Sequence, residues 1–417
     1  MAVQKISGIA LSNLSKFIGI AKASIKKIGS VTYTQTTYAT WNNGDRSSYI
    51  TLSNGNLTAT ASSSGWRSVR CNLGKNSGRY YFEITADSIA GSYPGQNALF
   101  GVADILMSVD NYVGSSSGNG WGWWGNDTQK QYYHAGSASS APVGIVNGDI
   151  VMIAFDVEAG KIWFGKNGTW NGSGDPGAGT NEVYSGLDAF SNTYYACLSL
   201  QSPAYATANF GATAFSHTVP AGFVAGLPQI TYTSWNSADK SSLLTLSNGN
   251  LTATHDSSDS WASLRSVVGK SSGKWYWEYT MTSSLANEYA VVGVANSSQA
   301  LNNHAGSSTN SWGYYQETGQ KFYNDSGSSY GNSFTTGDKI GVALNMDTGK
   351  IWFSKNGTWQ NSGDPAAGTG EAFSGLSGTL YPMVSMIQHS TVITANFGSS
   401  KFSYVPPAGF MPGLYSL

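Results

Sequence analysis

The sequence predicts an all-β protein built from two antiparallel β-sandwiches in tandem. An internal repeat runs through most of the chain: residues 40–60 match residues 234–254, and residues 147–164 match residues 336–353. Short aromatic-rich runs alternate with glycine-containing turns, which is typical of strands joined by tight turns. No stretch of residues 32–417 has apolar residues at convincing helical spacing, so we expect short strands packed into sandwiches.

The repeat divides the chain into three predicted parts. A domain of about 190 residues occurs twice, over residues 32–228 and over residues 229–417. The offset between the copies drifts from 195 to 187, which indicates small loop deletions within one duplicated unit. Residues 1–31 have no counterpart in the second copy and are treated as a short N-terminal anchoring segment.

Strand signals follow the same order in both copies. The aromatic runs RYYFEI at 79–84 and KWYWEY at 274–279 come first, each after a turn that contains glycine. An apolar run then leads through the turn EAG or DTG into the return strand GKIWF, where glycine supplies the positive φ of the turn. Alternation along that strand is expected to bury Trp352 or its neighbours, but not all of residues 351–353. The tripeptide KNG predicts a second bend, and a long small-residue loop follows up to Gly370.

Residues 1–31 form a predicted basic amphipathic docking segment. They contain five lysines and no acidic residue. Lysines interrupt every apolar stretch, so neither a secretory signal nor a membrane span is expected, and membrane contact is not the favoured role. The glycines in this segment also permit extended structure. The apolar positions at helical spacing that are expected to dock are Leu14, Phe17, Ile18, Ile25 and Ile28.

The composition excludes several classes of function. Charged residues make up 11% of the chain, against about 25% in a typical soluble domain, and the formal net charge is −1. Such a balance gives no general attraction to nucleic acid, so no nucleic-acid partner is expected. Two cysteines, Cys71 and Cys197, cannot build a disulfide framework and are expected to be buried free thiols.

No catalytic or metal-binding pattern is convincing. The five histidines lack metal-ligand spacing. GKSSG at 269–273 matches the pattern around a nucleophilic serine, but its duplicate reads GKNSG and the element leads into a strand. Carboxylates such as Asp156 and Glu158 flank a hairpin turn. We therefore predict no enzyme activity, no cofactor and no metal.

Two aromatic clusters, at 120–134 and 311–325, are the candidate ligand-binding sites. Each has aromatic strands around a polar turn, which suits stacking on a sugar ring or gripping a peptide. The alternative is that alternate rings fill the sandwich core. The preceding loops, 104–120 and 295–311, differ between the copies, so unequal binding is expected. The candidate residues are Trp121, Trp123, Trp124, Tyr132, Tyr133, Trp312, Tyr314, Tyr315, Phe322 and Tyr323.

Each copy resembles a SPRY domain. The resemblance rests on GRYYFEI and GKWYWEY, on LFGVA and VVGVA, on GWGWW and SWGYY, and on the run that ends in GKIWFGKNG or GKIWFSKNG before a closing ANFG. It covers almost all of residues 32–417. The resemblance implies two antiparallel sheets packed face to face, generally no catalysis, and binding of peptides or other ligands through loops at one edge.

The loop TWQNSGDPAAGTG and the N-terminal segment are similar to those of bacteriophage structural proteins. They predict a non-enzymatic virion protein, such as a fibre or decoration protein, assembled in the host cytoplasm. Residues 1–31 would attach it to other capsid or tail proteins, as a homo-oligomer, and the SPRY-like domains would adhere to a host-surface glycan or protein. The alternatives are a soluble cellular peptide- or glycan-recognition protein, and a particle enzyme that degrades polysaccharide.

Overall fold

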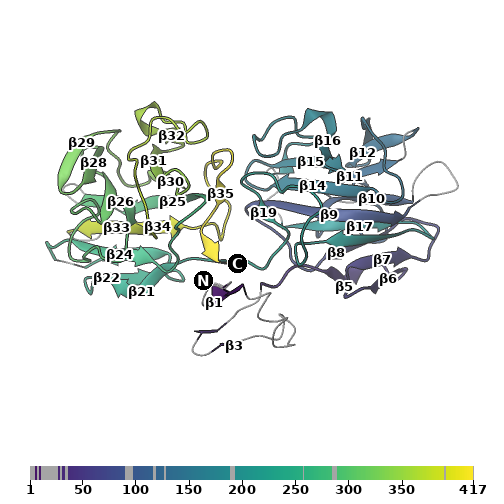
Figure 1. Cartoon of the computed structure of the whole chain (residues 1–417), viewed down its shortest axis with the longest axis horizontal. Coiled ribbons are helices and arrows are strands. Elements are labelled where there is room, and N and C mark those ends of the chain that lie inside the picture. Colours follow the sequence, from purple (N-terminus) through teal and green to yellow (C-terminus); the bar gives the residue numbers. More distant parts are fainter. Residues whose placement is uncertain are drawn as a thin grey trace.

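The computed structural model confirms an all-β fold with two sandwiches (Figure 1). Outside the first 35 residues it describes 36–89, 97–115, 119–125, 128–187, 193–256, 258–283, 289–388 and 391–416. Before residue 36 it describes two short hairpins. They pair β1 (Lys5–Ile6) with β2 (Ile9–Ala10) and β3 (Lys27–Ile28) with β4 (Val31–Thr32).

The predicted docking helix is only partly covered by these hairpins. Ile28 lies in β3, so this position has the extended backbone that the glycine content of the segment allows. Leu14, Phe17, Ile18 and Ile25 lie outside the described residues. Their docking role stays a prediction of the sequence.

Domain 1 consists of two antiparallel sheets that enclose one core. The first sheet has the order β13-β12-β11-β10-β17-β8-β5. Its strands are β5 (Trp41–Arg46), β8 (Arg67–Cys71), β10 (Ala98–Asp104), β11 (Gly120–Gly125), β12 (Lys130–His134), β13 (Ser137–Ser140) and β17 (Tyr194–Leu200). The second sheet has the order β16-β15-β14-β9-β18-β7-β6, and β19 pairs with β9 in parallel. Its strands are β6 (Ile50–Ser53), β7 (Thr58–Ala61), β9 (Arg79–Ser88), β14 (Ile150–Asp156), β15 (Lys161–Lys166), β16 (Thr169–Trp170), β18 (Tyr205–Asn209) and β19 (Val224–Ala225).

Domain 2 repeats this topology strand for strand. Its first sheet has the order β21-β24-β33-β26-β27-β28-β29. These strands are β21 (Trp235–Lys240), β24 (Ala262–Ser266), β26 (Tyr289–Ala295), β27 (Ser311–Tyr315), β28 (Gln320–Tyr323), β29 (Ser326–Ser329) and β33 (Tyr381–Ile387). The second sheet has the order β22-β23-β34-β25-β30-β31-β32, with β35 parallel to β25. These strands are β22 (Leu244–Ser247), β23 (Thr252–His255), β25 (Lys274–Ser283), β30 (Lys339–Asn345), β31 (Lys350–Lys355), β32 (Thr358–Trp359), β34 (Val392–Asn396) and β35 (Met411–Pro412); β20 (Thr231–Tyr232) pairs with β36 (Tyr415–Ser416).

The burial of residues 351–353 in the return strand β31 differs from the sequence prediction. Ile351, Trp352 and Phe353 are all fully buried. Ile351 and Phe353 face the core, while Trp352 lies on the outer face and packs with Phe402 and Phe410 of the loop that follows β34. The outer face of this sheet is therefore covered by a loop and is not exposed to solvent, so alternation alone does not predict exposure.

The small-residue loop after β31 is explained by the same packing. Trp352 Nε1 donates a 2.8 Å hydrogen bond to the carbonyl of Thr369, and in domain 1 Trp163 Nε1 donates to Thr180 at 2.9 Å. A buried indole N–H needs an acceptor, and this loop supplies it in both copies. The loop is repeated because the fold needs it.

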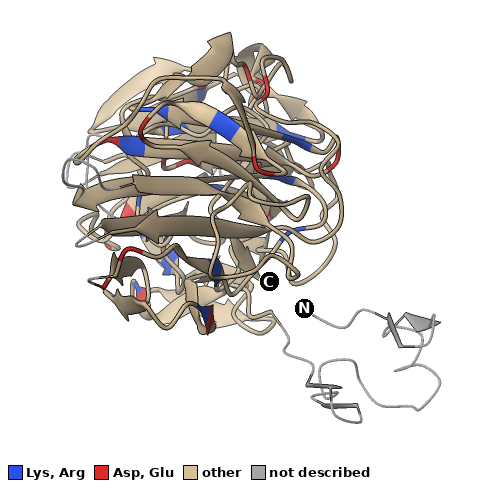
Figure 2. Ribbon diagram, turned by 90° about the vertical axis from the view of Figure 1, so that its left-hand side faces the viewer, with Lys and Arg blue, Asp and Glu red and all other residues tan. Residues whose placement is uncertain are grey.

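The two domains lie side by side and contact each other, with β19 and β35 toward the junction (Figure 1). Arg79 of β9 donates hydrogen bonds to the carbonyls of Pro406, Pro407 and Phe410 in domain 2. Basic and acidic residues are interspersed over the ribbon (Figure 2). Among the described residues, no helix has the length and apolar character that crossing a membrane requires.

Candidate functional site

The structure separates the predicted aromatic residues into core and surface sets. Alternation along β11 and β12 turns Trp121, Trp123 and Tyr132 into the sandwich, and Trp124 and Tyr133 toward the outer face, where Trp124 is still buried. The buried members are Trp121, Trp123, Trp124, Tyr132 and Tyr314. The members that keep accessible surface are Tyr133, Trp312, Tyr315, Phe322 and Tyr323. Contact with a ligand is therefore open to the second set only, and for that set it stays a prediction.

In domain 1, three segments pack over Tyr133 on the outer face of the first sheet. Together they form a surface of aromatic and charged side chains. We call Tyr49, Trp66, Arg67, Asp110 and Tyr112 the loop surface. They come from the turn between β5 and β6, the loop between β7 and β8 with the first residue of β8, and the loop between β10 and β11. Tyr49 is 48% exposed.

Ring contacts connect the loop surface to the predicted candidates. The Tyr112 ring lies 5.5 Å from that of Tyr133 and 6.1 Å from that of Trp66, measured between centroids. Tyr133 in turn packs edge-on against Trp124. Burial raises the pKa of the Tyr133 hydroxyl above its ordinary value, so this hydroxyl stays protonated and donates to Gln131 Oε1. The buried rings thus support the exposed ones from behind.

Arg67 supplies the positive charge of the loop surface. Its guanidinium carbon lies 4.9 Å above the centroid of the Tyr49 ring, which is within the range of a cation–π interaction. Its Nη1 donates to the carbonyl of Trp66 at 2.8 Å. Its Nε lies 3.9 Å from the Asp110 carboxylate, which is too far for a hydrogen bond. Nη1 also donates to the carbonyl of Asp110 at 3.4 Å, and Nε is buried, so Nη2 is the nitrogen of the guanidinium that keeps hydrogen-bonding capacity for a bound group.

Buried polar contacts hold the loops of this surface in place. The hydroxyls of Ser68 and Ser199 are 2.7 Å apart in the interior, and Ser199 Oγ also accepts from the backbone N–H of Val113 at 2.8 Å. Arg70 forms a bidentate ion pair with Asp45, at 2.8 and 2.7 Å. Such contacts keep the rings above them preorganised, which lowers the entropy cost of binding.

Domain 2 keeps the support and changes the surface. Ser263 and Ser385 repeat the buried serine pair at 2.7 Å, and Arg265 repeats the ion pair with Asp239. The positions that match Tyr49, Arg67 and Tyr112, however, hold a leucine, an alanine and a histidine. Those residues are Leu243, Ala262 and His304. The aromatic and cationic surface is therefore specific to domain 1.

The loop surface can stack on apolar or planar groups and can hydrogen-bond to carbonyl or carboxylate oxygens.

Within the described part of the chain, no group of three or more His, Cys, Asp or Glu side chains could hold a metal ion. Cys71 and Cys197 are free and buried, as expected, and burial raises their thiol pKa to about 11 and about 12.

The sequence analysis named Trp124 and Tyr133, which pack behind the loop surface, and did not name the five residues of that surface. The missed residues come from loops that are up to 63 positions apart, as the hydrogen bond from Ser47 Oγ to Asp110 Oδ1 illustrates. The available signal was the difference between the loops 104–120 and 295–311, which pointed to unequal domains. No sequence pattern within a loop shows which other loops it contacts in the folded domain.

Comparison with known proteins supports the architecture. Residues 79–213 and 274–400, more than half of the chain, match the SPRY domain family model. Ran-binding protein 9 of Xenopus laevis is 33% identical over 178 residues, 41% of this chain and 31% of that protein. Human Ran-binding protein 9 is 30% identical over 178 residues, 41% of this chain and 23% of that protein. The SPRY domain of human HERC1 is 25% identical, with a TM-score of 0.32, and the match covers 39% of this chain and 96% of that domain. The chain matches less than a third of the length of these curated relatives.

These relatives correct the predicted origin. They are cellular animal proteins, so the prediction of a bacteriophage virion protein of fibre or decoration type is wrong. The predicted partners and the virion location are wrong with it: other virion proteins bound through residues 1–31, further copies of the chain, and a host-surface glycan or protein. The loop that suggested a phage origin serves the fold instead, because it accepts the indole N–H of Trp352. The relatives favour the alternative of a cellular recognition protein.

Proposed function

The chain belongs to the SPRY domain family, and from this premise we propose that it is a non-enzymatic recognition protein that binds a segment of a cellular protein partner. The binding site is the loop surface of domain 1. The observation that carries this proposal is the preorganised set of Tyr49, Trp66, Arg67 and Tyr112, of which domain 2 keeps only the tryptophan, as Trp261, and replaces the other three.

The chemistry of the loop surface favours a peptide over a glycan. Aromatic rings and arginine are the side chains most enriched among the residues that dominate protein interfaces. The hydrogen-bonding capacity left on Arg67 suits a backbone carbonyl or an acidic side chain of the partner. The names of the relatives state that those proteins bind Ran, which makes Ran one protein to test here.

A displayed peptide library, selected on the full chain, tests the proposal. We expect selected peptides to lose about tenfold or more in affinity when Trp66→Ala or Tyr112→Ala is introduced, since truncating an anchor at an interface costs about 2 kcal/mol. The affinity is measured by isothermal titration calorimetry.

Trp261→Ala is the matched control, because Trp261 occupies the position of Trp66 in domain 2. It should leave the affinity unchanged. Unfolding curves of all variants show whether the sandwiches stay folded. Equal loss of affinity in the domain 1 and domain 2 variants would reject the assignment to domain 1. If the affinity of the selected peptides changes in neither set of variants, the loop surface is not the binding site.

A further inference from the structure

A second site lies at the junction of the two domains, away from the loop surface. It is a cleft of about 760 Å³, to which domain 1 contributes Trp170, residues 175–178 and residues 216–221, and domain 2 contributes Ala366 and residues 408–409. We call it the junction cleft. Its volume is within the range of about 300–1,000 Å³ in which proteins bind ligands.

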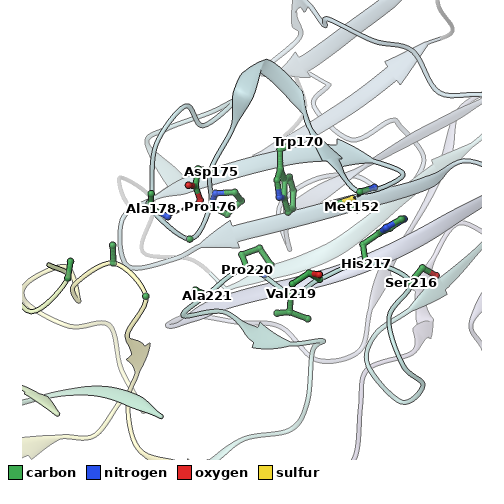
Figure 3. A pocket seen from close by; sticks show the side chains of 16 residues that line it. Met152, Trp170, Asp175, Pro176, Ala178, Ser216, His217, Val219, Pro220 and Ala221 are labelled. Carbon is green, nitrogen blue, oxygen red and sulfur yellow. Dashed lines mark hydrogen bonds between the residues drawn. The ribbon is translucent and has the colours of Figure 1, made fainter. Parts of the chain in front are cut away.

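The walls of the junction cleft are mostly apolar. Figure 3 shows Trp170, Pro176, Val219 and Pro220 around the same space, with Met152 beside the indole. Domain 2 contributes only alanine and glycine at its edge, so its side chains leave the space open. A single indole flanked by proline rings is the kind of surface on which another proline ring packs.

The walls are held by internal contacts, so the junction cleft is preformed. The backbone N–H groups of Ser216 and His217 donate to the buried carboxylate of Glu83 at 3.0 and 2.9 Å. Asp175 and Thr180 close the opposite loop with a pair of backbone hydrogen bonds, both 3.0 Å. The entropy cost of ordering these walls when a ligand binds is therefore small.

Asp175 is the one formally charged side chain among the described residues that line the junction cleft. Arg79 donates to the carbonyls of Pro407 and Phe410 behind the domain 2 edge, so the negative charge is local to the rim of domain 1. Asp175 is exposed at this rim, and the Glu83 carboxylate lies behind the wall formed by residues 216–217. No lysine or arginine lines the described cleft. The pattern disfavours phosphate or carboxylate ligands and favours a ligand that carries a cation.

We propose that the junction cleft binds an extended, proline-containing segment of a partner protein in which a lysine or arginine lies next to a proline. The proline ring packs against the indole of Trp170, and the basic side chain pairs with Asp175. Proline-rich segments are already extended in solution, so they lose little conformational freedom when they dock in such a groove. This site is independent of the function proposed for the loop surface.

Domain 2 provides built-in controls for each part of the proposal. Asp364 and Trp359 occupy the positions of Asp175 and Trp170 in the second copy. Asp175 Oδ1 accepts from the N–H of Ala178 at 3.0 Å, and Asp364 Oδ1 accepts from Ala367 at the same distance. Asparagine keeps that acceptor, so Asp175→Asn and Asp364→Asn remove only the charge.

The test titrates the full chain into a fluorescein-labelled peptide of repeating Pro-Pro-Lys and follows fluorescence anisotropy. We expect binding that weakens about three- to tenfold in Asp175→Asn at low salt and not in Asp364→Asn. A Pro-Pro-Glu peptide and an Ala-Ala-Lys peptide should each bind at least about tenfold more weakly. Trp170→Ala should abolish binding, while Trp359→Ala should not.

A second variant keeps the test decisive if Trp170→Ala fails to fold. Ala178→Trp places a large ring at an exposed position of the rim and should block the peptide without loss of stability. Tyr112→Ala, at the loop surface, should leave the affinity for Pro-Pro-Lys unchanged. No measurable binding of Pro-Pro-Lys, equal binding of Pro-Pro-Glu, or equal loss in the domain 1 and domain 2 variants would overturn the proposal.

Discussion

At the scale of single residues, a buried hydroxyl connects the fold to the proposed binding surface. Ser199 Oγ lies 2.7 Å from Ser68 Oγ and accepts from the N–H of Val113, which directly follows Tyr112. Ser385 makes the same contacts in domain 2 with Ser263 and Ala305. The position of the Tyr112 ring therefore depends on a side chain that no ligand touches.

Replacing Ser199 with alanine should have two effects. The free energy of unfolding should fall by about 1–3 kcal/mol, because the buried N–H of Val113 loses its acceptor and the Ser68 hydroxyl loses one of its two partners. Affinity for the peptides selected on the loop surface should also fall several-fold, because Tyr112 is no longer held. Chemical denaturation and calorimetry measure the two effects separately.

Ser385→Ala is the matched variant, and it should destabilise domain 2 by a similar amount without changing peptide affinity. If Ser199→Ala weakens stability and leaves peptide binding intact, the serine pair does not position the loop surface.

At the scale of elements, the hairpin that ends in KNG depends on one asparagine. Asn356 has a φ of 50°, its Oδ1 accepts from the N–H of Lys339 at 2.8 Å, and its Nδ2 donates to Asp338 at 2.7 Å. Asn167 has the same φ and the same contacts in domain 1. Asparagine tolerates the left-handed backbone and also ties the turn to the start of β30.

This geometry predicts an order of stability among variants. Asn356→Gly loses the side-chain hydrogen bonds and should lower the free energy of unfolding by about 1 kcal/mol. Asn356→Ala loses the same hydrogen bonds and also places a Cβ on a left-handed backbone. Its free energy of unfolding should therefore be about 1–2 kcal/mol lower than that of the glycine variant. Urea unfolding of the two variants measures the difference. Equal stability of the glycine and alanine variants would contradict a role for the backbone conformation.

Elements of this kind were predictable because their signals are local. The strand segments, the glycine turns and the Asn-Gly bends could each be read within a few residues, and the repeat could be read by aligning the two halves of the chain. The full burial of Ile351, Trp352 and Phe353 could not, because it depends on Phe402 and Phe410, about fifty residues further along the chain. The loop surface was hidden for the same reason, since Tyr49, Arg67 and Asp110 meet only in the folded domain.

At the scale of the whole molecule, the two copies differ where they touch. Arg79 is ion-paired to Asp156 at 2.7 Å and also donates to three carbonyls of domain 2. Glu158 accepts from Gly78 N–H and, across the junction, from Phe402 N–H. The matching residues of domain 2 are a lysine, an asparagine and an aspartate, Lys274, Asn345 and Asp347. These substitutions mark the junction in the sequence, but the sequence does not show the surface that each residue contacts.

Protonation of Glu158 makes the stability of this junction depend on pH. Burial raises its pKa to about 7, although the two backbone N–H groups and Arg79 oppose the shift. Because the folded state binds this proton more tightly than the unfolded state, the contribution of Glu158 to stability is fully present below a pH of about 4.5. It is then lost as the pH rises through about 7, and the loss is on the order of 3 kcal/mol.

The prediction is made for the full chain, with Glu158→Gln as the comparison. Glutamine carries no charge, but its single carbonyl oxygen can accept from only one of the Gly78 and Phe402 N–H groups, so the variant loses one buried hydrogen bond at every pH. The lost hydrogen bond gives a constant offset, so the test is the pH trend: the stability of the wild type relative to the variant should be greatest near a pH of about 5 and should fall as the pH rises to about 8. Denaturant unfolding across this pH range measures the difference. Asp347→Asn, at the matching and more accessible position of domain 2, should not reproduce the trend. A wild type that gains stability relative to the glutamine variant as the pH rises would show that the hydrogen bonds, and not burial, dominate at Glu158, and the junction would then be held by an ionised carboxylate.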